Sequence, residues 1–354
     1  MHISACHLIP YYLPLRHPWR SARGIFTHRA GWLVRLESDS GLAGHGDCAP
    51  LPEAGSETPE SALAYLQIQL PLLHGGEPQA ALADLGGTHA PAARCALETA
   101  LLDLAAQQAG VALAHCLNPC APSAVRVNAV LGAMDDAVSA RARAALEAGF
   151  SVLKLKVGLT APDIELAALH HLAGGLPPGA VLRLDANGAW RLNQAQRFIE
   201  QLDGLPVESL EEPLARPNIA GLRYLQALAP FPLAVDESLA RLGADALLAS
   251  AAVRRLVLKP MALGGVRPAY ALARRAAEAG MECVATSTVD SMVGVAAAMH
   301  LAAALDNELA HGVATASWLA RDVAKPLRLE KGWVYLDNAM AIGGLGVCPS
   351  QAEN

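Results

Sequence analysis

Ionisable side chains recur at the ends of short β-rich runs after residue 150, and they are the residues best suited to chemistry. The set consists of Lys154, Lys156, Asp185, Glu211, Asp236 and Lys259. From one run to the next they lie about 25 residues apart, which is the length of one strand, loop, helix and loop of a parallel barrel. A single acidic residue after a strand is more often a helix cap or a solvated loop charge. Three of them in register indicate a common site.

The three carboxylates of Asp185, Glu211 and Asp236 require a cation if their strands are neighbours. Two carboxylates about 4 Å apart repel each other by about 4 kcal/mol at an effective dielectric constant of about 20. A divalent cation removes this repulsion, and an all-oxygen ligand set suits Mg²⁺, with Mn²⁺ as a substitute. Zn²⁺ is disfavoured because neither His nor Cys stands at these strand ends.

The lysines supply the other half of the predicted site. In Lys154-Leu155-Lys156 the strand period of two puts both amines on one face. A neighbouring ammonium and a divalent cation both favour the neutral form of a lysine, which a general base requires. Lys259 comes from a strand on the far side of the metal. This arrangement favours removal of a proton α to a carboxylate, because a cation can stabilise the resulting enediolate. A Lys-x-Lys pattern alone would instead indicate an edge strand.

The elements that must position these residues are eight short runs separated by Ala- and Leu-rich helical patterns. The runs are residues 125–129, 152–157, 181–185, 209–211, 233–236, 256–259, 283–286 and 309–311. The intervening helices include residues 135–148 and 266–279, which end at Gly149 and Gly280. Eight alternating units favour a closed α/β barrel over residues 121–329. An open, doubly wound sheet is the alternative.

Residues 1–120 have a different pattern and are predicted to form an α+β domain. Residues 30–37 and 42–46 flank a turn at Ser38-Asp39-Ser40-Gly41 and indicate an antiparallel hairpin. Apolar residues at intervals of three and four predict helices over residues 60–73 and 92–106.

Composition excludes several functional classes. The chain has 354 residues, with 27 Lys and Arg against 33 Asp and Glu, and only 17% are charged. No basic block is present, so we expect no nucleic-acid partner. The N-terminus does not resemble a secretory signal, and the most apolar stretch, residues 289–305, contains Asp290 and His300. We therefore expect a cytoplasmic protein without a membrane segment. Seven scattered cysteines argue against a disulfide framework. The charge balance is compatible with a homo-oligomer and does not specify one.

Five motifs resemble, in order and spacing, the muconate-lactonizing subgroup of the enolase superfamily. They are Leu153-Lys154-Leu155-Lys156-Val157-Gly158, Arg183-Leu184-Asp185-Ala186-Asn187, Leu210-Glu211-Glu212-Pro213, Val235-Asp236-Glu237-Ser238 and Leu258-Lys259-Pro260. The resemblance implies a (β/α)7β modified TIM barrel with an α+β capping domain, which residues 330–354 would complete. Its cap loops, here about Ser21–Arg29 and Gly46–Glu57, are expected to close over the substrate. The pairing of a lysine base with Mg²⁺ is the general pattern of this superfamily.

The resemblance also assigns roles to individual residues. It implies that Asp185, Glu211 and Asp236 are the Mg²⁺ ligands, that Lys156 and Lys259 are the catalytic lysines on opposite faces, that Lys154, Arg183, Asn187 and Ser287 bind a small-molecule carboxylate, and that Glu237 supports this inner set.

Within the subgroup, the chain most resembles the o-succinylbenzoate synthases of menaquinone biosynthesis. Lys259-Pro260, Gly264-Gly265 and Thr286-Ser287-Thr288 carry this similarity. It implies a carbon–oxygen lyase that performs a syn dehydration with Lys156 as the proton carrier. Asp290 and Asp47 depart from the pattern, because Glu is typical at the first position and an acidic Gly-Glu pair near the second. An N-acylamino-acid or dipeptide racemase and a muconate-type cycloisomerase are the alternatives, since they use the same frame of residues.

Overall fold

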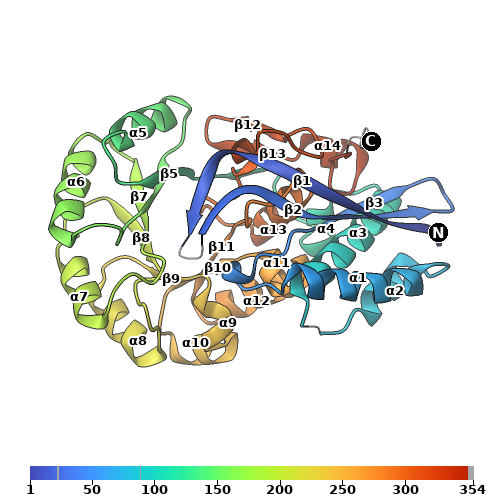
Figure 1. The fold of residues 1–354 in the computed structure, drawn as a ribbon, viewed down its shortest axis with the longest axis horizontal. Helices are drawn as coiled ribbons and strands as arrows, with labels where there is room; N and C mark the ends of the chain where they lie inside the picture. Colours follow the sequence, from blue (N-terminus) through green and yellow to red (C-terminus); the bar gives the residue numbers. More distant parts are fainter. Residues whose placement is uncertain (22–23, 88, 350–354) are drawn as a thin grey trace.

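The computed structural model describes residues 1–21, 24–87 and 89–349. In this part of the chain, an antiparallel sheet and its helices lie beside a curled parallel sheet that helices cover on the outside (Figure 1). No helix in the described ranges is long and apolar enough to cross a membrane. The expected loop at about Ser21–Arg29 includes residues 22 and 23, which lie outside the described residues, as do residues 350–354.

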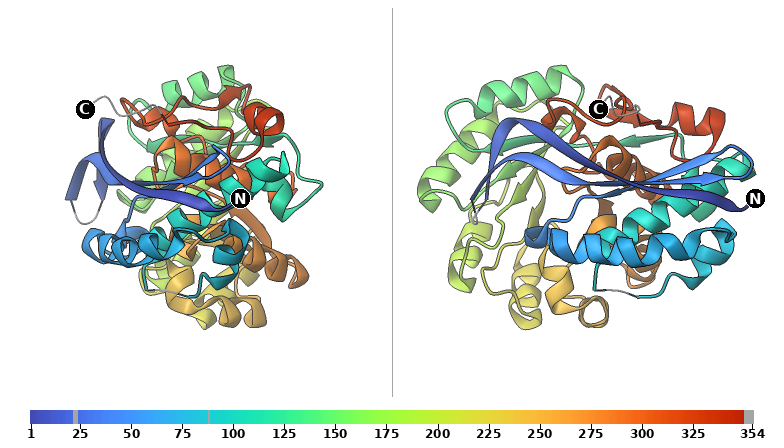
Figure 2. Two further views of the ribbon diagram at one scale, coloured as in Figure 1. Left: turned by 90° about the vertical axis from the view of Figure 1, so that its right-hand side faces the viewer. Right: turned by 45° about the vertical axis from the view of Figure 1, so that its right-hand side comes forward.

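The N-terminal region, residues 1–120, contains the predicted hairpin and helices. Its elements are β1 (Ile3–Ser21), β2 (Gly24–Ser38), β3 (Ala43–Cys48), the 3-10 turn η1 (Pro52–Ala54), α1 (Pro59–Leu73), α2 (Pro78–Asp84), α3 (Pro91–Ala109) and α4 (Leu113–Leu117). The strands pair in the order β1–β2–β3, all antiparallel. Strand β3 packs directly on α3, since a Cβ added at Gly46 would lie 1.8 Å from the carbonyl oxygen of Ala96. The long β1–β2 hairpin extends from the helices to the barrel (Figure 2).

The second part of the chain alternates strands and helices as predicted. Its elements are β5 (Ala129–Ala133), α5 (Val138–Glu147), β6 (Val152–Lys156), α6 (Pro162–Gly174), β7 (Val181–Asp185), α7 (Leu192–Glu200), β8 (Val207–Glu211), α8 (Ile219–Leu228), β9 (Leu233–Val235), α9 (Ser238–Leu242), α10 (Ala244–Ser250), β10 (Arg255–Leu258), α11 (Pro260–Leu263), α12 (Val266–Glu278), β11 (Glu282–Ala285), α13 (Met292–Leu305) and the 3-10 turn η2 (Ala316–Trp318). Strands β5 to β11 form one parallel sheet in chain order. Gly149 and Gly280 have positive φ after their helices, as the predicted caps require.

The predicted eighth strand closes the barrel through isolated bridges. His311 forms a parallel bridge with Val127, just before β5, and Gly312 forms one with Thr286, just after β11. The amide of Gly312 donates to the carbonyl of Ala285, and the amide of Asn128 donates to that of His311. The two edges of the parallel sheet are thereby joined, which confirms the barrel over the open sheet.

The predicted first strand, residues 125–129, was misplaced. Strand β4 (Ala124–Arg126) pairs with β13 (Trp333–Tyr335), and the barrel begins only at β5. The C-terminal elements β12 (Arg328–Glu330), β13 and α14 (Asp337–Ile342) return toward the N-terminal region. There the amide of Leu345 donates to the buried carboxylate of Asp103 on α3. Strands β4 and β5 are both short and largely apolar. Periodicity therefore could not show which of them belongs to the barrel and which pairs with the C-terminal segment.

The N-terminal region also contacts the barrel at the start of α12. Glu98 of α3 is buried and accepts a hydrogen bond from the amide of Arg267 at 3.1 Å. Gly265 precedes α12 with a φ of 144°, and an added Cβ would lie 2.0 Å from a carboxylate oxygen of Glu98. The Gly264-Gly265 motif therefore permits this close approach, and any side chain at Gly265 would separate the two parts.

Candidate active site

Strand alternation places the candidate residues inside the barrel. In β6, Leu153 and Leu155 are fully buried, whereas the side chains of Lys154 and Lys156 are 21% and 31% exposed. Side chains two apart share a face of a strand, so both lysines point to the interior while the leucines pack outward. The same alternation in β7 turns Asp185 inward. In register, Lys156 lies opposite Asp185, and Asp185 lies opposite Glu211 of β8.

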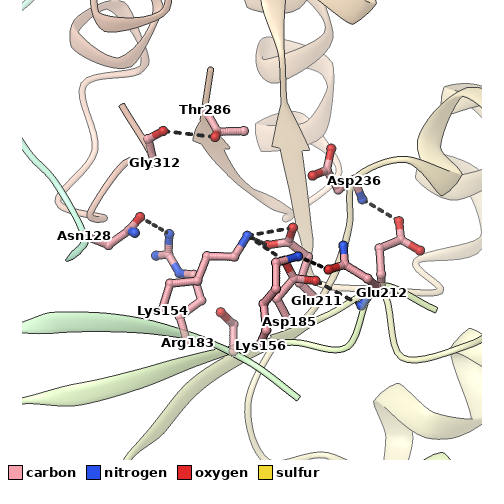
Figure 3. Close-up of polar contacts among 12 residues, drawn as sticks. Asn128, Lys154, Lys156, Arg183, Asp185, Glu211, Glu212, Asp236, Thr286 and Gly312 are labelled. Atoms are coloured by element: carbon pink, nitrogen blue, oxygen red, sulfur yellow. Dashed lines mark hydrogen bonds and ion pairs between the residues drawn. The ribbon is translucent and has the colours of Figure 1, made fainter. Parts of the chain in front are cut away.

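Lys154 forms the centre of the observed polar network (Figure 3). Its ammonium lies 2.9 and 2.8 Å from the two carboxylate oxygens of Glu211 and 3.1 Å from an oxygen of Asp185. Burial by itself lowers the pKa of Lys154, but the carboxylates of Asp185, Glu211 and Asp236 raise it above its ordinary value. Lys154 is therefore a fixed ammonium in this conformation.

Lys156 has a different environment, although it is only two residues away. Its ammonium donates to the side-chain oxygen of Asn187 and lies 3.8 Å from an oxygen of Asp185. Asn187 adopts a left-handed φ of 43°, and its amide donates to Asp185 at 3.1 Å. The structure thus brings Asn187 to the predicted base. Lys156 is the more exposed of the two lysines and has the weaker contact with the carboxylates.

Lys259 lies at the end of β10, close to Asp236 and Glu237. Its ammonium is 2.5 Å from an oxygen of Asp236 and 3.1 Å from an oxygen of Glu237. Burial lowers the pKa of Lys259, and the two carboxylates raise it by more, so that it exceeds its ordinary value. Glu237 therefore contacts one of the predicted catalytic lysines, as a supporting residue should.

Sequence reasoning missed the role of Glu212, which shapes the loop after β9. This buried residue has a left-handed φ of 47°, and one carboxylate oxygen accepts bonds from the amides of Asp236 and Ser238 at 2.7 and 2.9 Å. The Ser238 hydroxyl donates to the same oxygen. The only signal in the sequence was the adjacent pair Glu211-Glu212, in which the second residue cannot share the barrel-facing side of the strand with the first.

The structure does not bring Arg183 to the other candidate residues. Arg183 is 3% exposed and donates to Glu208 at 3.1 Å, to Asn128 at 3.3 Å and to the carbonyl of Ala310 at 2.9 Å. Arg183 lies two residues before Asp185, on the same face of β7, and pairs with Lys154 in register. A bulge between β7 and β8 offsets the pairing beside Glu208. The donors of Arg183 are engaged in a network inside the barrel, and its role in substrate binding remains a prediction.

Ser287 follows β11 and faces the end of the eighth strand. Its hydroxyl shares a 2.6 Å hydrogen bond with the hydroxyl of Thr315, and both residues are buried. Thr286 donates to the carbonyl of Gly312 at 3.0 Å (Figure 3). Hydroxyl groups therefore join the end of β11 to the segment that follows the eighth strand.

The carboxylates suit a magnesium ion in chemistry but are not assembled around one point. Asp185, Glu211 and Asp236 are buried oxygen donors on three adjacent strands, and an ammonium already bridges the first two. As the side chains stand, no group of three or more His, Cys, Asp or Glu residues in the described ranges could hold a metal. Lys154 lies between Asp185 and Glu211, and Lys259 contacts Asp236, so a metal bound by these carboxylates would have to replace both ammonium contacts.

Two family models together match most of the sequence. Residues 7–117 match the N-terminal domain of the mandelate racemase / muconate lactonizing enzymes, and residues 137–353 match the enolase C-terminal domain-like family.

Individual relatives carry two kinds of activity in their names. A hydrophobic dipeptide epimerase of Roseobacter litoralis is 33% identical over 305 residues, which are 83% of this chain and 86% of the relative. An o-succinylbenzoate synthase of Thermosynechococcus vestitus is 34% identical over 234 residues, 64% of this chain and 66% of the relative. The structure of a dipeptide epimerase from Enterococcus faecalis, complexed with Mg and a dipeptide, is 26% identical with a TM-score of 0.88 and covers 98% of this chain and 99% of that one. The chain therefore belongs to the mandelate racemase / muconate lactonizing enzymes of the enolase superfamily.

Proposed function

We propose that this enzyme is a magnesium-dependent lyase of the o-succinylbenzoate synthase type, acting in menaquinone biosynthesis. Its substrate is a hydroxycyclohexadiene carboxylate, from which it removes water. Asp185, Glu211 and Asp236 would hold Mg²⁺, which would supply charge neutralisation for a substrate carboxylate and for the enediolate formed from it. A relative of known structure that contains Mg supports the choice of metal.

The observation that carries the choice of substrate is the uncharged segment after the eighth strand, which Thr315 connects to Ser287. Residues 312–320, Gly-Val-Ala-Thr-Ala-Ser-Trp-Leu-Ala, contain no charged side chain. Thr315 in this segment shares a hydrogen bond with Ser287, which follows β11. A dipeptide has a free ammonium, whose burial requires a carboxylate partner. Three carboxylates of the cluster would be committed to the metal, Glu237 is paired with Lys259, and Asp290 accepts hydrogen bonds from Thr288. A substrate with anionic and neutral groups therefore suits this site better than a dipeptide.

Lys156 performs the proton transfers in this mechanism. Its neutral amine takes the proton from the carbon α to the carboxylate, and the electron pair of that C–H bond moves into the enediolate. The enediolate then re-forms the carboxylate, and its electrons make a double bond as the C–O bond of the hydroxyl group breaks. The Lys156 ammonium returns its proton to the departing oxygen, which leaves as water. Asn187 contacts the amine throughout and keeps it directed at one face of the substrate.

Lys259 acts as a fixed positive charge on the opposite face. It lies at the end of β10, four strands from Lys156 on β6, so the two lysines face each other across the barrel. The contact with Glu237 at 3.1 Å would hold its ammonium near this position when Asp236 binds the metal. From there it stabilises the developing negative charge without exchanging a proton.

A racemase acting on an N-acylated amino acid is the second candidate, and the same opposition of lysines favours it. Such a substrate lacks a free ammonium, and racemisation requires a proton carrier on each face. Curated relatives with epimerase or racemase activity include an N-succinyl-L-Arg/Lys racemase of Bacillus cereus, which is 25% identical to this chain.

The deciding experiment compares the two reactions in one preparation with Mg²⁺. Dehydration of the synthase substrate is measured beside α-proton exchange of an N-succinylamino acid in deuterium oxide, for wild type, Lys156→Ala and Lys259→Ala. We expect dehydration without racemisation, with exchange in wild type confined to one enantiomer. Loss of the base should reduce dehydration by about 10²–10⁴-fold in Lys156→Ala. Efficient racemisation with negligible dehydration would refute the synthase assignment and establish the racemase.

A further inference from the structure

The two positions at which the sequence departs from the family pattern lie side by side in the structure. Asp47 is in β3, and Asp290 is in the loop between β11 and α13; both are buried. A Cβ added at Gly294 of α13 would lie 2.7 Å from Cβ of Asp290 and 2.7 Å from a carboxylate oxygen of Asp47. The N-terminal region and the barrel thus meet at a pair of buried carboxyl groups with only a glycine between them.

Asp47 connects the N-terminal sheet to the barrel through both of its oxygens. One oxygen accepts a hydrogen bond from the Tyr11 hydroxyl of β1 at 2.7 Å. The other accepts from the amide of Ser291 at 2.9 Å, immediately before α13 begins. This contact gives an acceptor to one of the free amides at the N-terminus of α13. On the barrel side, Asp322 accepts from the next amide, that of Met292, at 2.9 Å.

The loop that Asp47 holds, residues 286–291, contains a strained residue. Val289 has a φ of 60°, a conformation that is strongly disfavoured for a β-branched side chain. Its carbonyl accepts a hydrogen bond at 3.1 Å from Arg29 of β2, which also donates to the carbonyls of Ala49 and Pro50. Strain of this kind persists where surrounding contacts over-determine the backbone. At Val289 itself the side-chain contact comes from Arg29 of the N-terminal region.

The same loop reaches the candidate active site. It carries Ser287, which bonds to Thr315, and Thr288, whose hydroxyl contacts the sulfur of Met261 at 3.8 Å. Met261 is the second residue of α11, two positions after Lys259. Asp290 accepts hydrogen bonds from the amide and hydroxyl of Thr288. A displacement of the loop would therefore move Ser287. It would also move Thr288, which contacts Met261 in the helix that follows Lys259.

We propose that Asp47 is a positioning residue for the reaction, which holds the strained 286–291 loop, and with it Ser287, in place from the N-terminal region. Arg29 and Tyr11 complete this connection on the same side. The inference rests on the proposed site and does not depend on which carboxylate substrate the enzyme uses.

The test uses the full chain with three variants: Asp47→Asn, Tyr11→Phe and the double variant. The amide that replaces the Asp47 carboxylate has a single acceptor oxygen, so only one contact keeps its direction: either Tyr11 must accept from the new NH2 group, or the Ser291 amide loses its acceptor. Hydrogen exchange is followed by mass spectrometry in a peptide covering residues 286–293, without substrate. Steady-state kinetics are measured on whichever substrate the enzyme turns over. Asp39→Asn, at an exposed position in the turn after β2, is the matched control.

In Asp47→Asn we expect faster exchange of that peptide by at least fivefold, a KM increase of about three- to tenfold, and kcat within twofold of wild type. Tyr11→Phe should produce a smaller change, and should add little in the double variant because both substitutions act through one carboxylate. Unchanged exchange and KM in Asp47→Asn would overturn the inference. If that variant does not fold, Tyr11→Phe alone decides, by the same two readouts. Exchange is measured without substrate, so failure of the proposed function would leave this result intact.

Discussion

The buried network below the active site yields a sharp prediction for Glu208→Gln. The Glu208 side chain is 17% exposed and accepts hydrogen bonds from Arg183 at 3.1 Å and from Arg255 at 2.6 Å. Both arginine side chains are almost fully buried. The glutamine keeps the shape of the side chain but removes the charge that compensates two guanidinium groups.

The size of the effect follows from the pKa of Glu208. Burial alone raises this pKa, but Arg183 and Arg255 lower it, to about 2 from an ordinary 4.5. At about 1.36 kcal/mol per pKa unit, ionised Glu208 contributes about 3 kcal/mol to the free energy of unfolding. Because the folded pKa is depressed, this contribution is present above about pH 4.5 and is lost as the pH falls toward about 2.

Urea denaturation at pH 7 measures the change directly. We expect Glu208→Gln to lower the free energy of unfolding by about 3 kcal/mol, within the range of about 3–5 kcal/mol for breaking a buried ion pair. Wild type should lose this stability between about pH 4.5 and 2, whereas the variant should show a correspondingly smaller loss. Glu200→Gln is the control, because Glu200 is exposed on α7 and its contact with Gln196 is worth at most about 0.5 kcal/mol.

A free energy of unfolding within about 0.5 kcal/mol of wild type would refute the reasoning on Glu208. The same variant tests whether Arg183 has a structural role or binds substrate. If Arg183 is structural, the damage should be to stability, with KM changed by less than twofold. A large rise in KM at unchanged stability would restore Arg183 to substrate binding, as the sequence predicted.

Three further predictions concern the contact between the two parts of the chain and the metal. Gly265→Ala should lower the free energy of unfolding by at least about 2 kcal/mol in urea denaturation, since the new Cβ would lie 2.0 Å from a carboxylate oxygen of Glu98 and the φ of residue 265 is 144°. Gly86→Ala is the control and should leave stability unchanged, because no atom lies within 4 Å of the Cβ it adds. Burial and the charge of Asp290 raise the pKa of Asp47 from 3.8 to about 7. The folded state therefore binds the proton of the Asp47 carboxyl group more tightly than the unfolded state does. The contribution of Asp47 to the free energy of unfolding should fall by about 4 kcal/mol as the pH rises from about 4 to about 7. Thermal denaturation across this range should show a correspondingly smaller fall in Asp47→Asn. A chelator should abolish catalysis. In a thermal shift assay, Mg²⁺ at 100 times its Kd should stabilise the apoprotein by about 2.7 kcal/mol, and Asp185→Asn should remove that stabilisation.

Periodicity was informative wherever an element has one exposed and one buried face. The alternation in β6 correctly turned Lys154 and Lys156 to the same side, because the leucines between them must pack against helices. It failed at residues 125–129, where two short apolar runs follow each other and only pairing partners distinguish them. The domain boundary near residue 120 remains a prediction.

Contacts between distant segments could not be predicted in the same way. Arg183 and Asp185 have the same strand period, yet one enters a structural network and the other the candidate site. The bulge beside Glu208 and the position of Arg255 decide this difference. Neither leaves a signal in the sequence near Arg183.

The sequence by itself determined the order of the barrel and the identity of the charged cluster, because strand period and unit length are local properties of the chain. It also carried the family resemblance that the comparisons confirmed. Only the tertiary structure decided how those charges pair, with Lys154 between Glu211 and Asp185 and Lys259 against Asp236. It also decided that Asp47 and the strained loop near Val289 lie together. Such pairings depend on distances between segments that are far apart in the chain. The packing of the whole molecule sets these distances, and no local sequence pattern encodes them.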